Sequence, residues 1–168
     1  MAYVITGATG HIGNNLARSL IQNHKEVVIL TRRMDRAIEG LHAKFIVGDI
    51  FDDSFLDNHI RENDIVIHLA GVIDIKNNKM DETYKINYEM TKKLVDKCMN
   101  KNIERFIYFS SVDCIYKKND EKVVEPEEIF ADKFSDNYRH TKALATPYVL
   151  KMRRLYPNIK INILYPSA

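Results

Sequence analysis

The chain has 168 residues, of which 45% are hydrophobic and 29% are charged, and its formal net charge is only +2. That length suffices for one domain with a well-buried core. The small net charge and the lack of a long basic run argue against a nucleic-acid-binding surface. No apolar run approaches the roughly 18 residues that a membrane-spanning helix needs, which argues against a membrane protein.

The two cysteines, Cys98 and Cys114, lack the spacing of a metal site. We expect both to be free thiols in a reducing compartment, with no metal bound. The first predicted strand begins at residue 2 and leaves no room for a signal peptide. We therefore expect a cytoplasmic protein.

The first motif along the chain is a glycine-rich turn at residues 6–13, with the sequence T-G-A-T-G-H-I-G. A short β-rich run at residues 2–5 precedes it and apolar residues at helical spacing follow it, so we predict a strand, a turn and a helix. Glycines in such a turn permit a positive φ and let backbone N–H groups approach a diphosphate, whose charge the helix N-terminus favours. A strand-to-helix turn without a ligand is the alternative.

The second predicted strand, residues 26–30, is followed closely by Arg32 and Arg33. In dinucleotide folds an acidic residue here binds the ribose 2′-hydroxyl, whereas an arginine accommodates the 2′-phosphate of NADP. Two arginines and no acid favour NADP over NAD, with Arg32 the better candidate. Alternatively, both are solvated cations of a surface loop.

Predicted helices and strands alternate along the rest of the chain. We expect helices at residues 35–41, 54–61, 81–100 and 135–155, and strands at 44–50, 64–71, 105–111 and 160–165. Small residues end the 64–71 strand and leave space for a cofactor, whereas His68 sits inside its apolar run and is interpreted as structural. The long loop at 112–134 is functional or mobile, and Pro147 should kink the last helix or displace its C-terminal half.

Tyr138 and Lys142 form a Y-x-x-x-K motif in the last predicted helix. Residues four apart lie on one helix face, and a nearby cation should lower the pKa of the phenol from its usual value near 10. The tyrosine can then exchange a proton with a substrate hydroxyl or carbonyl, while a serine polarises the carbonyl oxygen. An exposed helical pair, worth a few tenths of a kcal/mol, is the alternative.

The motifs together and in this order resemble the extended branch of the short-chain dehydrogenase/reductase superfamily, which includes sugar-nucleotide epimerases and dehydratases, dihydroflavonol reductases and hydroxysteroid dehydrogenases. The resemblance rests on the glycine turn, Gly48-Asp49, H-L-A-G at 68–71, the helix bearing Asn87, the Ser110-Ser111 pair and Y-x-x-x-K. It implies an α/β Rossmann domain. Right-handed crossovers between alternating strands and helices predict a doubly wound parallel sheet with strand order 3-2-1-4-5-6.

The resemblance also implies roles for individual residues. Asp49, with the N–H of Ile50, would contact the adenine, although Asp49 could instead cap the next helix. Asn87 would hold a water that relays protons to Lys142, although an exposed asparagine is the alternative, and Lys142 would hold the nicotinamide ribose. The expected cofactor-binding residues are Thr6, Gly7, Thr9, Gly10, His11, Ile12, Gly13, Arg32, Asp49, Ile50, Leu69, Ala70, Gly71, Tyr138 and Lys142.

Two departures from the family pattern concern the catalytic serine and Pro147, which lies five residues past Lys142. Alignment with the epimerases places Val112 where they have their catalytic serine or threonine, so Ser111 falls one place early. The serine pair of dihydroflavonol reductases is closer, and we select Ser111, with Ser110 in reserve. The T-G-x-x-G-x-x-G spacing resembles the family's own cofactor motif, although it differs from the general G-x-G-x-x-G dinucleotide fingerprint.

The chain stops at residue 168, where extended-family proteins continue into a smaller substrate-binding domain. We therefore expect residues 1–168 to be the NAD(P)-binding half of a longer two-lobed protein, inactive alone, or a stand-alone module. The function hypothesis is an NADP-dependent oxidoreductase that acts on a ketone or secondary alcohol. An NAD-dependent sugar-nucleotide epimerase or dehydratase and a non-catalytic dinucleotide-binding module are the alternatives. Relatives often dimerise through the two long helices, so a homodimer is expected here.

Overall fold

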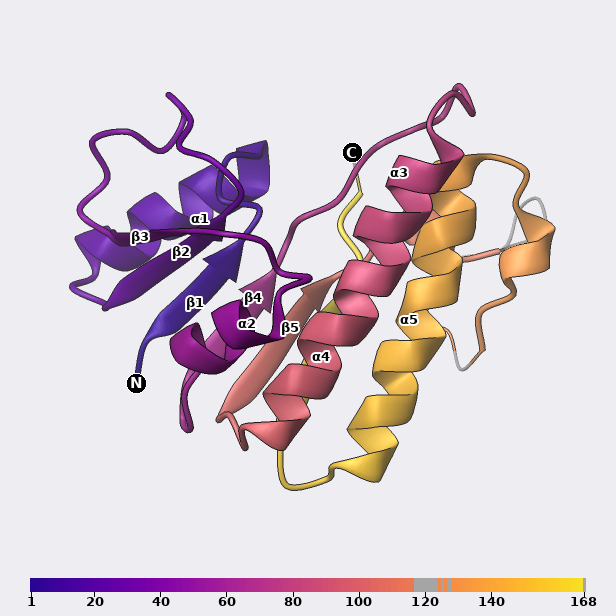
Figure 1. Ribbon diagram of the computed structural model, residues 1–168. Helices are drawn as coiled ribbons and strands as arrows, with labels where there is room; N and C mark the ends of the chain where they lie inside the picture. The colour runs from indigo at the N-terminus through magenta and orange to yellow at the C-terminus, as the bar shows by residue number, and fades with distance from the viewer. Residues whose placement is uncertain (117–123, 125, 127, 168) are drawn as a thin grey trace.

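The computed structural model describes residues 1–116, 124, 126 and 128–167 (Figure 1). Its centre is one parallel sheet in the order β3-β2-β1-β4-β5-β6, which confirms the predicted topology. The strands are β1 (Tyr3–Thr6), β2 (Val27–Thr31), β3 (Lys44–Val47), β4 (Ile65–His68), β5 (Arg105–Phe109) and β6 (Lys160–Leu164). The strand order reverses between β1 and β4, and the carboxyl ends of these two strands lie level because Thr6 pairs with His68.

Helices cover both faces of the sheet (Figure 1). They are α1 (His11–Gln22), α2 (Asp53–His59), α3 (Met80–Tyr84), α4 (Met90–Asn100) and α5 (Asn137–Leu155). Neighbouring residues of β1 point to opposite faces, so Val4 packs in the core beneath α2, α4 and α5, while Ile5 packs on the side of α1. Among the described residues, no helix is both long enough and apolar enough to cross a bilayer.

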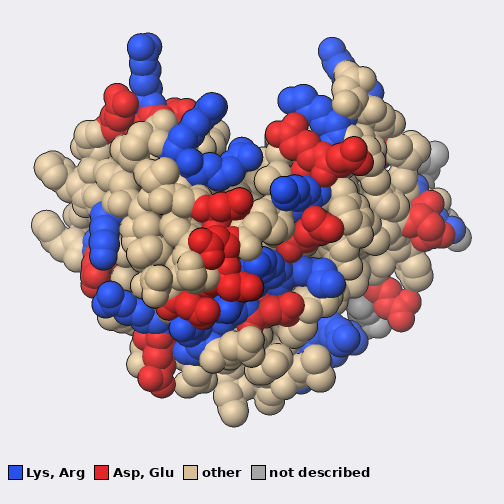
Figure 2. All heavy atoms as spheres, in the orientation of Figure 1, with Lys and Arg blue, Asp and Glu red and all other residues tan. Residues whose placement is uncertain are grey.

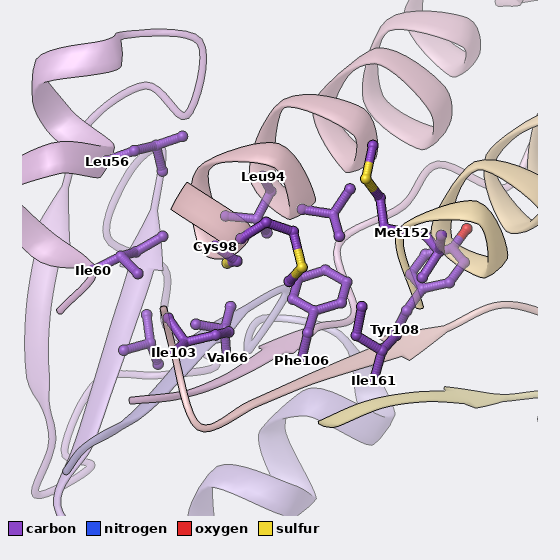
Figure 3. Close-up of a cluster of buried hydrophobic side chains, with 14 of the residues drawn as sticks. Leu56, Ile60, Val66, Leu94, Cys98, Ile103, Phe106, Tyr108, Met152 and Ile161 are labelled. Atoms are coloured by element: carbon purple, nitrogen blue, oxygen red, sulfur yellow. The ribbon is translucent and has the colours of Figure 1, made fainter. Parts of the chain in front are cut away.

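The larger core lies between the sheet and the helices α2, α4 and α5. Figure 3 shows side chains from all three helices converging on side chains from β4, β5 and β6. Residues such as Leu94, Cys98 and Phe106 are fully buried. Both cysteines are buried free thiols, as expected.

On the outer surface, α2 is joined to α4 by ion pairs. Lys97 lies 3.1 Å from Asp57 and Lys101 lies 3.1 Å from the same carboxylate, while Lys93 lies 3.1 Å from Asp53. Figure 2 shows these charges interspersed over the two helices. The pairs hold α2 against α4, next to residues 48–51, which follow β3.

Several predicted elements differ in the structure. The strands predicted at 44–50 and 64–71 each end three residues earlier, at Val47 and His68. Residues 36–40 form turns and not a helix, because the segment is short and ends at Gly40, whose φ is +78°. The long helix predicted at 81–100 is interrupted by a π-helical segment, Lys85–Glu89, that joins α3 to α4. Pro147 lies inside α5 without ending it, so the predicted displacement of the C-terminal half of the helix is wrong, while the predicted kink stays a prediction.

Candidate functional site

A cavity of about 210 Å³ opens where β1, β2, β3 and β4 end. Figure 2 shows the surface hollowed above the sheet, with Lys and Arg side chains on both rims. Its walls include most of the predicted cofactor-binding residues: Thr6, Gly7, Thr9, Gly10, Arg32, Asp49, Ile50, Leu69, Ala70 and Gly71. His11, Ile12 and Gly13 lie just behind this lining, in the first turn of α1. The cavity is also lined by residues that sequence reasoning missed, namely Ala8, Leu30, Thr31, Gly48, Phe51, Val72, Ile86 and Met90.

The glycine turn requires glycine at two positions. Gly7 has a φ of +80°, and a Cβ atom added there would lie 2.4 Å from the backbone nitrogen of Ala70. A Cβ atom on Gly13 would lie 2.3 Å from the carbonyl oxygen of Gly7. Gly10 precedes α1 and offers no side chain to cap it, so the first N–H groups of the helix remain available to an anion. The turn is thus shaped to hold the backbone against an anionic group.

At the other end of the cavity lie Arg32 and Asp49. Asp49 accepts a hydrogen bond from the N–H of Phe51, at 2.9 Å, and does not cap the following helix. That cap is Asp52, which accepts from the N–H groups of Ser54 and Phe55. The helix-capping alternative for Asp49 is therefore wrong, and the side chain of Arg32 is exposed beside it.

Asn87 is fully buried, so the alternative of an exposed asparagine is wrong. Its side chain accepts from the N–H of Val72 at 2.8 Å and donates to the carbonyl of Val72 at 2.9 Å. It also donates to the hydroxyl of Thr141 at 3.0 Å. Asn87 lies in the π-helical segment, and such interruptions of a helix are frequent at functional sites.

The side chains of Asn87 and Lys142 converge at Gly71, on the cavity wall. A Cβ atom added to Gly71 would lie 3.2 Å from Oδ1 of Asn87 and 3.6 Å from Nζ of Lys142. Lys142 is only 4% exposed and donates to the carbonyl of Phe109 at 2.8 Å. Burial lowers the pKa of Lys142 to about 8.

Tyr138 follows the first residue of α5 and is partly buried. Burial raises the pKa of its phenol, and a hydrogen bond with Ser111 opposes that rise. The direction is opposite to the predicted lowering, because desolvation outweighs any effect of the ammonium of Lys142, which is bonded to Phe109.

The two serines after β5 face different surroundings. Ser110 is buried against Thr146, with 2.7 Å between the hydroxyl oxygens, and lies 3.2 Å from the sulfur of Cys114. Ser111 donates to the carboxylate of Asp113 and is the serine bonded to Tyr138. The geometry therefore favours Ser111 over Ser110 as a partner of the phenol.

Asp74 is a further residue that sequence reasoning missed. It is buried, and its carboxylate accepts from Nδ2 of Asn137 at 2.7 Å and from the N–H of Lys79 at 2.8 Å. The carbonyl of Asp74 accepts from the N–H of Tyr138 at 3.3 Å. The hydrogen bond from Asn137 is the main reason that the pKa of Asp74 is lowered. In the sequence, the only feature that marks Asp74 is its position between two isoleucines, Ile73 and Ile75. The structure shows that both of them are exposed.

The sheet order, the glycine turn and the cavity at the switch point define a nucleotide-binding Rossmann domain of the extended short-chain dehydrogenase/reductase kind. Residues 4–159 match the 3-beta hydroxysteroid dehydrogenase/isomerase family, and the chain belongs to that family. Its members are NAD(P)-dependent dehydrogenases and epimerases.

Two curated relatives illustrate the match. Short-chain dehydrogenase/reductase family 42E member 1 of Xenopus laevis is 30% identical over 89% of this chain and 40% of its own length. The 3-beta-hydroxysteroid dehydrogenase of Mycolicibacterium neoaurum is 28% identical over 88% of this chain and 42% of its own length. The chain thus spans less than half the length of these relatives.

A solved structure with the same fold is a mutant of UDP-glucuronic acid 4-epimerase from Bacillus cereus in complex with UDP-4-deoxy-4-fluoro-glucuronic acid and NAD. It superposes with a TM-score of 0.83 at 22% identity, over 98% of this chain and 56% of the epimerase. This likeness shows that the chain has the fold of about half of that structure.

Proposed function

We propose that this chain is the dinucleotide-binding half of an NAD(P)-dependent oxidoreductase that transfers hydride between a nicotinamide and a ketone or secondary alcohol. The observation that carries the proposal is the convergence of Asn87 and Lys142 at Gly71, on the wall of the cavity that the glycine turn begins. The cradle fits the cofactor, because Gly7 and Gly13 leave room only for backbone, and the N-terminus of α1 is free to meet a diphosphate.

The proposed roles follow from the proton inventory of the site. When bound, the nicotinamide supplies or accepts the hydride. Tyr138 has a raised pKa, so it is protonated at neutral pH and donates a proton to the carbonyl oxygen in the direction of reduction. Ser111 orients that oxygen together with the phenol, by turning its hydroxyl proton from the carboxylate of Asp113 to the carbonyl oxygen. Lys142, with a pKa of about 8, exchanges protons near neutral pH, and Asn87 holds a water beside it.

The preference for NADP is part of the proposal and rests on Arg32, which is exposed at the cavity, with no acidic residue next to it in the sequence. We expect Arg32→Asp to weaken NADPH binding at least about tenfold and to leave NADH binding unchanged or tighter, since a guanidinium–phosphate pair is lost. Arg33→Asp is the matched control, because Arg33 does not line the cavity. Titration of each variant with both nucleotides provides the measurement.

A sugar-nucleotide epimerase or dehydratase is the second candidate, and the NAD complex of the Bacillus cereus epimerase favours it. Equal or tighter binding of NADH than NADPH by the wild-type chain would support this candidate instead. Turnover is measured on the full-length gene product with a panel of carbonyl compounds and sugar nucleotides. We expect Tyr138→Phe to abolish that turnover and to leave nucleotide affinity nearly unchanged. Undiminished turnover of the variant would reject the proposed acid/base role of Tyr138, whereas no turnover by the wild type would support a non-catalytic module.

We also propose a homodimer through the outer faces of α4 and α5. On that surface the hydroxyl of Tyr148 donates to the carboxylate of Asp96 at 2.8 Å, and Nζ of Lys92 lies 5.0 Å from the centre of the Tyr148 ring. Such an aromatic surface with paired polar groups is suited to a protein interface. Light scattering should give twice the chain mass of 19.6 kDa, whereas a monomer would refute the dimer.

A further inference from the structure

His68 ends β4 and has no role in the proposed chemistry, yet both of its ring nitrogens have partners. The side chain is fully buried. Nδ1 lies 2.7 Å from the hydroxyl oxygen of Thr6, and Nε2 lies 2.9 Å from that of Thr91. A buried imidazole without partners would cost free energy, so the two threonines make this position tolerable.

The hydrogen bonds around His68 have a fixed direction. The hydroxyl of Thr91 has one proton, which it donates to the carbonyl of Asn87 at 2.7 Å. It must therefore accept from an Nε2–H group, which leaves Nδ1 to accept from the hydroxyl of Thr6. Burial, reinforced by the charge of Lys142, lowers the pKa of His68 to about 3, so the ring stays neutral at physiological pH.

The two ends of this chain of hydrogen bonds belong to two different walls of the cavity. Thr6 directly precedes Gly7 in the glycine turn, while Asn87 holds Val72 through both of its backbone groups. The imidazole also stacks on Tyr108, with 5.8 Å between ring centres and 22° between ring planes. The ring therefore cannot turn without breaking both hydrogen bonds.

We propose that His68 is a positioning residue that sets the spacing between the glycine turn and the segment bearing Asn87, so that one nucleotide can contact both. The inference rests on the proposed binding of a dinucleotide in this cavity. The connection runs from Thr6 through the ring to Thr91 and the carbonyl of Asn87. Of the three side chains in this connection, Thr6 lines the cavity, whereas His68 and Thr91 do not.

The test removes the hydroxyl of Thr91, a buried residue that does not line the cavity. Thr91→Val keeps the shape, and Thr91→Ser keeps the hydroxyl. Thr83→Val is the matched control, because Thr83 is also buried in the same helical run and donates to a backbone carbonyl, that of Lys79, at 2.7 Å. The measured quantity is the dissociation constant of the chain for NADPH and NADH, with folding verified by circular dichroism.

We expect Thr91→Val to weaken nucleotide binding by roughly three- to tenfold, the effect of about one misplaced hydrogen bond. Thr91→Ser and Thr83→Val should each stay within about twofold of the wild type. Equal losses for Thr91→Val and Thr83→Val, or a serine variant as weak as the valine variant, would overturn the inference while leaving nucleotide binding intact. A wild-type chain that binds neither nucleotide would instead refute the proposed function, and the inference with it.

A second measurement does not depend on the folding of any variant. Nitrogen-15 spectra of the wild-type imidazole should show Nε2 protonated and Nδ1 unprotonated, because Thr91 can only accept from the ring. The opposite tautomer would overturn the positioning role, since it would break the link from the ring to Asn87.

Discussion

Replacing Gly7 by alanine should destabilise the domain much more than the same change at Gly40, although both glycines have a φ near +80°. At Gly40 nothing lies within 4 Å of an added Cβ atom, so only the backbone conformation is strained. At Gly7 the added atom would also lie 2.4 Å from the nitrogen of Ala70 and 2.6 Å from the carbonyl carbon of Leu69. These are backbone atoms of β4's continuation, and no rotamer change can move them.

The expected magnitudes follow from two separate costs. A non-glycine residue in the left-handed region costs about 1–2 kcal/mol, which is the whole effect expected at Gly40. Forcing an atom into close-packed surroundings adds about 1–3 kcal/mol, so Gly7→Ala should lose about 2–5 kcal/mol. Gly13→Ala isolates the second cost, because Gly13 is helical and its added atom would lie 2.3 Å from the carbonyl oxygen of Gly7. The gain in helix propensity, about 1 kcal/mol, reduces that loss.

Urea unfolding of the unliganded chain, followed by circular dichroism, measures these losses as changes in the free energy of unfolding. Gly10→Ala is the control with neither cost, because its added atom would meet only the carbonyl oxygen of Gly7, at 3.4 Å. We expect the loss to increase from Gly10 through Gly40 to Gly7. A loss at Gly7 no greater than that at Gly40 would refute the close approach of the turn to the end of β4.

Three further predictions concern the buried polar residues. On folding, the pKa of His68 falls from near 6.5 to about 3, so the folded state binds fewer protons than the unfolded state. The equilibrium constant for unfolding should therefore increase by up to tenfold for each pH unit below 6.5. His68→Gln should remove this slope in urea titrations between pH 6.5 and 5. Asn87→Asp should lower the free energy of unfolding by about 2–4 kcal/mol and weaken nucleotide binding, because a buried carboxylate cannot donate to the carbonyl of Val72. An unchanged melting temperature would contradict this prediction. Lys142→Met should stabilise the unliganded domain at pH 7 by up to about 3 kcal/mol. This is the free energy that it costs to hold the pKa of Lys142 near 8, less the contribution of the lost hydrogen bond to Phe109. Destabilisation in thermal melts would contradict the burial argument.

The strand order could be predicted because it depends on local patterns and on the handedness of crossovers. Apolar runs of four or five residues alternate with helical spacing, and right-handed connections then leave little choice of topology. The turn at residues 36–40 was wrongly predicted as a helix because a five-residue segment has too few hydrogen bonds to hold a helix without packing.

The environment of the candidate site could not be predicted, because it depends on contacts between distant segments. Asn87 is buried only because Val72 and Thr141, 15 residues before it and 54 after it, supply its partners. The raised pKa of Tyr138 depends on desolvation, which sequence spacing does not reveal. Asp74 was missed for the same reason, since its partner Asn137 is 63 residues away.

The burial of Lys142 is the strongest physical indication that these polar residues serve a ligand and not the fold. Among the described residues, the buried charged side chains are Asp64, Asp74, Asp136 and Lys142, so Lys142 is the only buried cation, and the described structure gives it a carbonyl partner and no carboxylate. A methionine of similar length would remove the desolvation cost without leaving a cavity. A cation kept at this cost, beside Asn87 on the wall of the cavity, is expected where a bound molecule supplies the missing interactions.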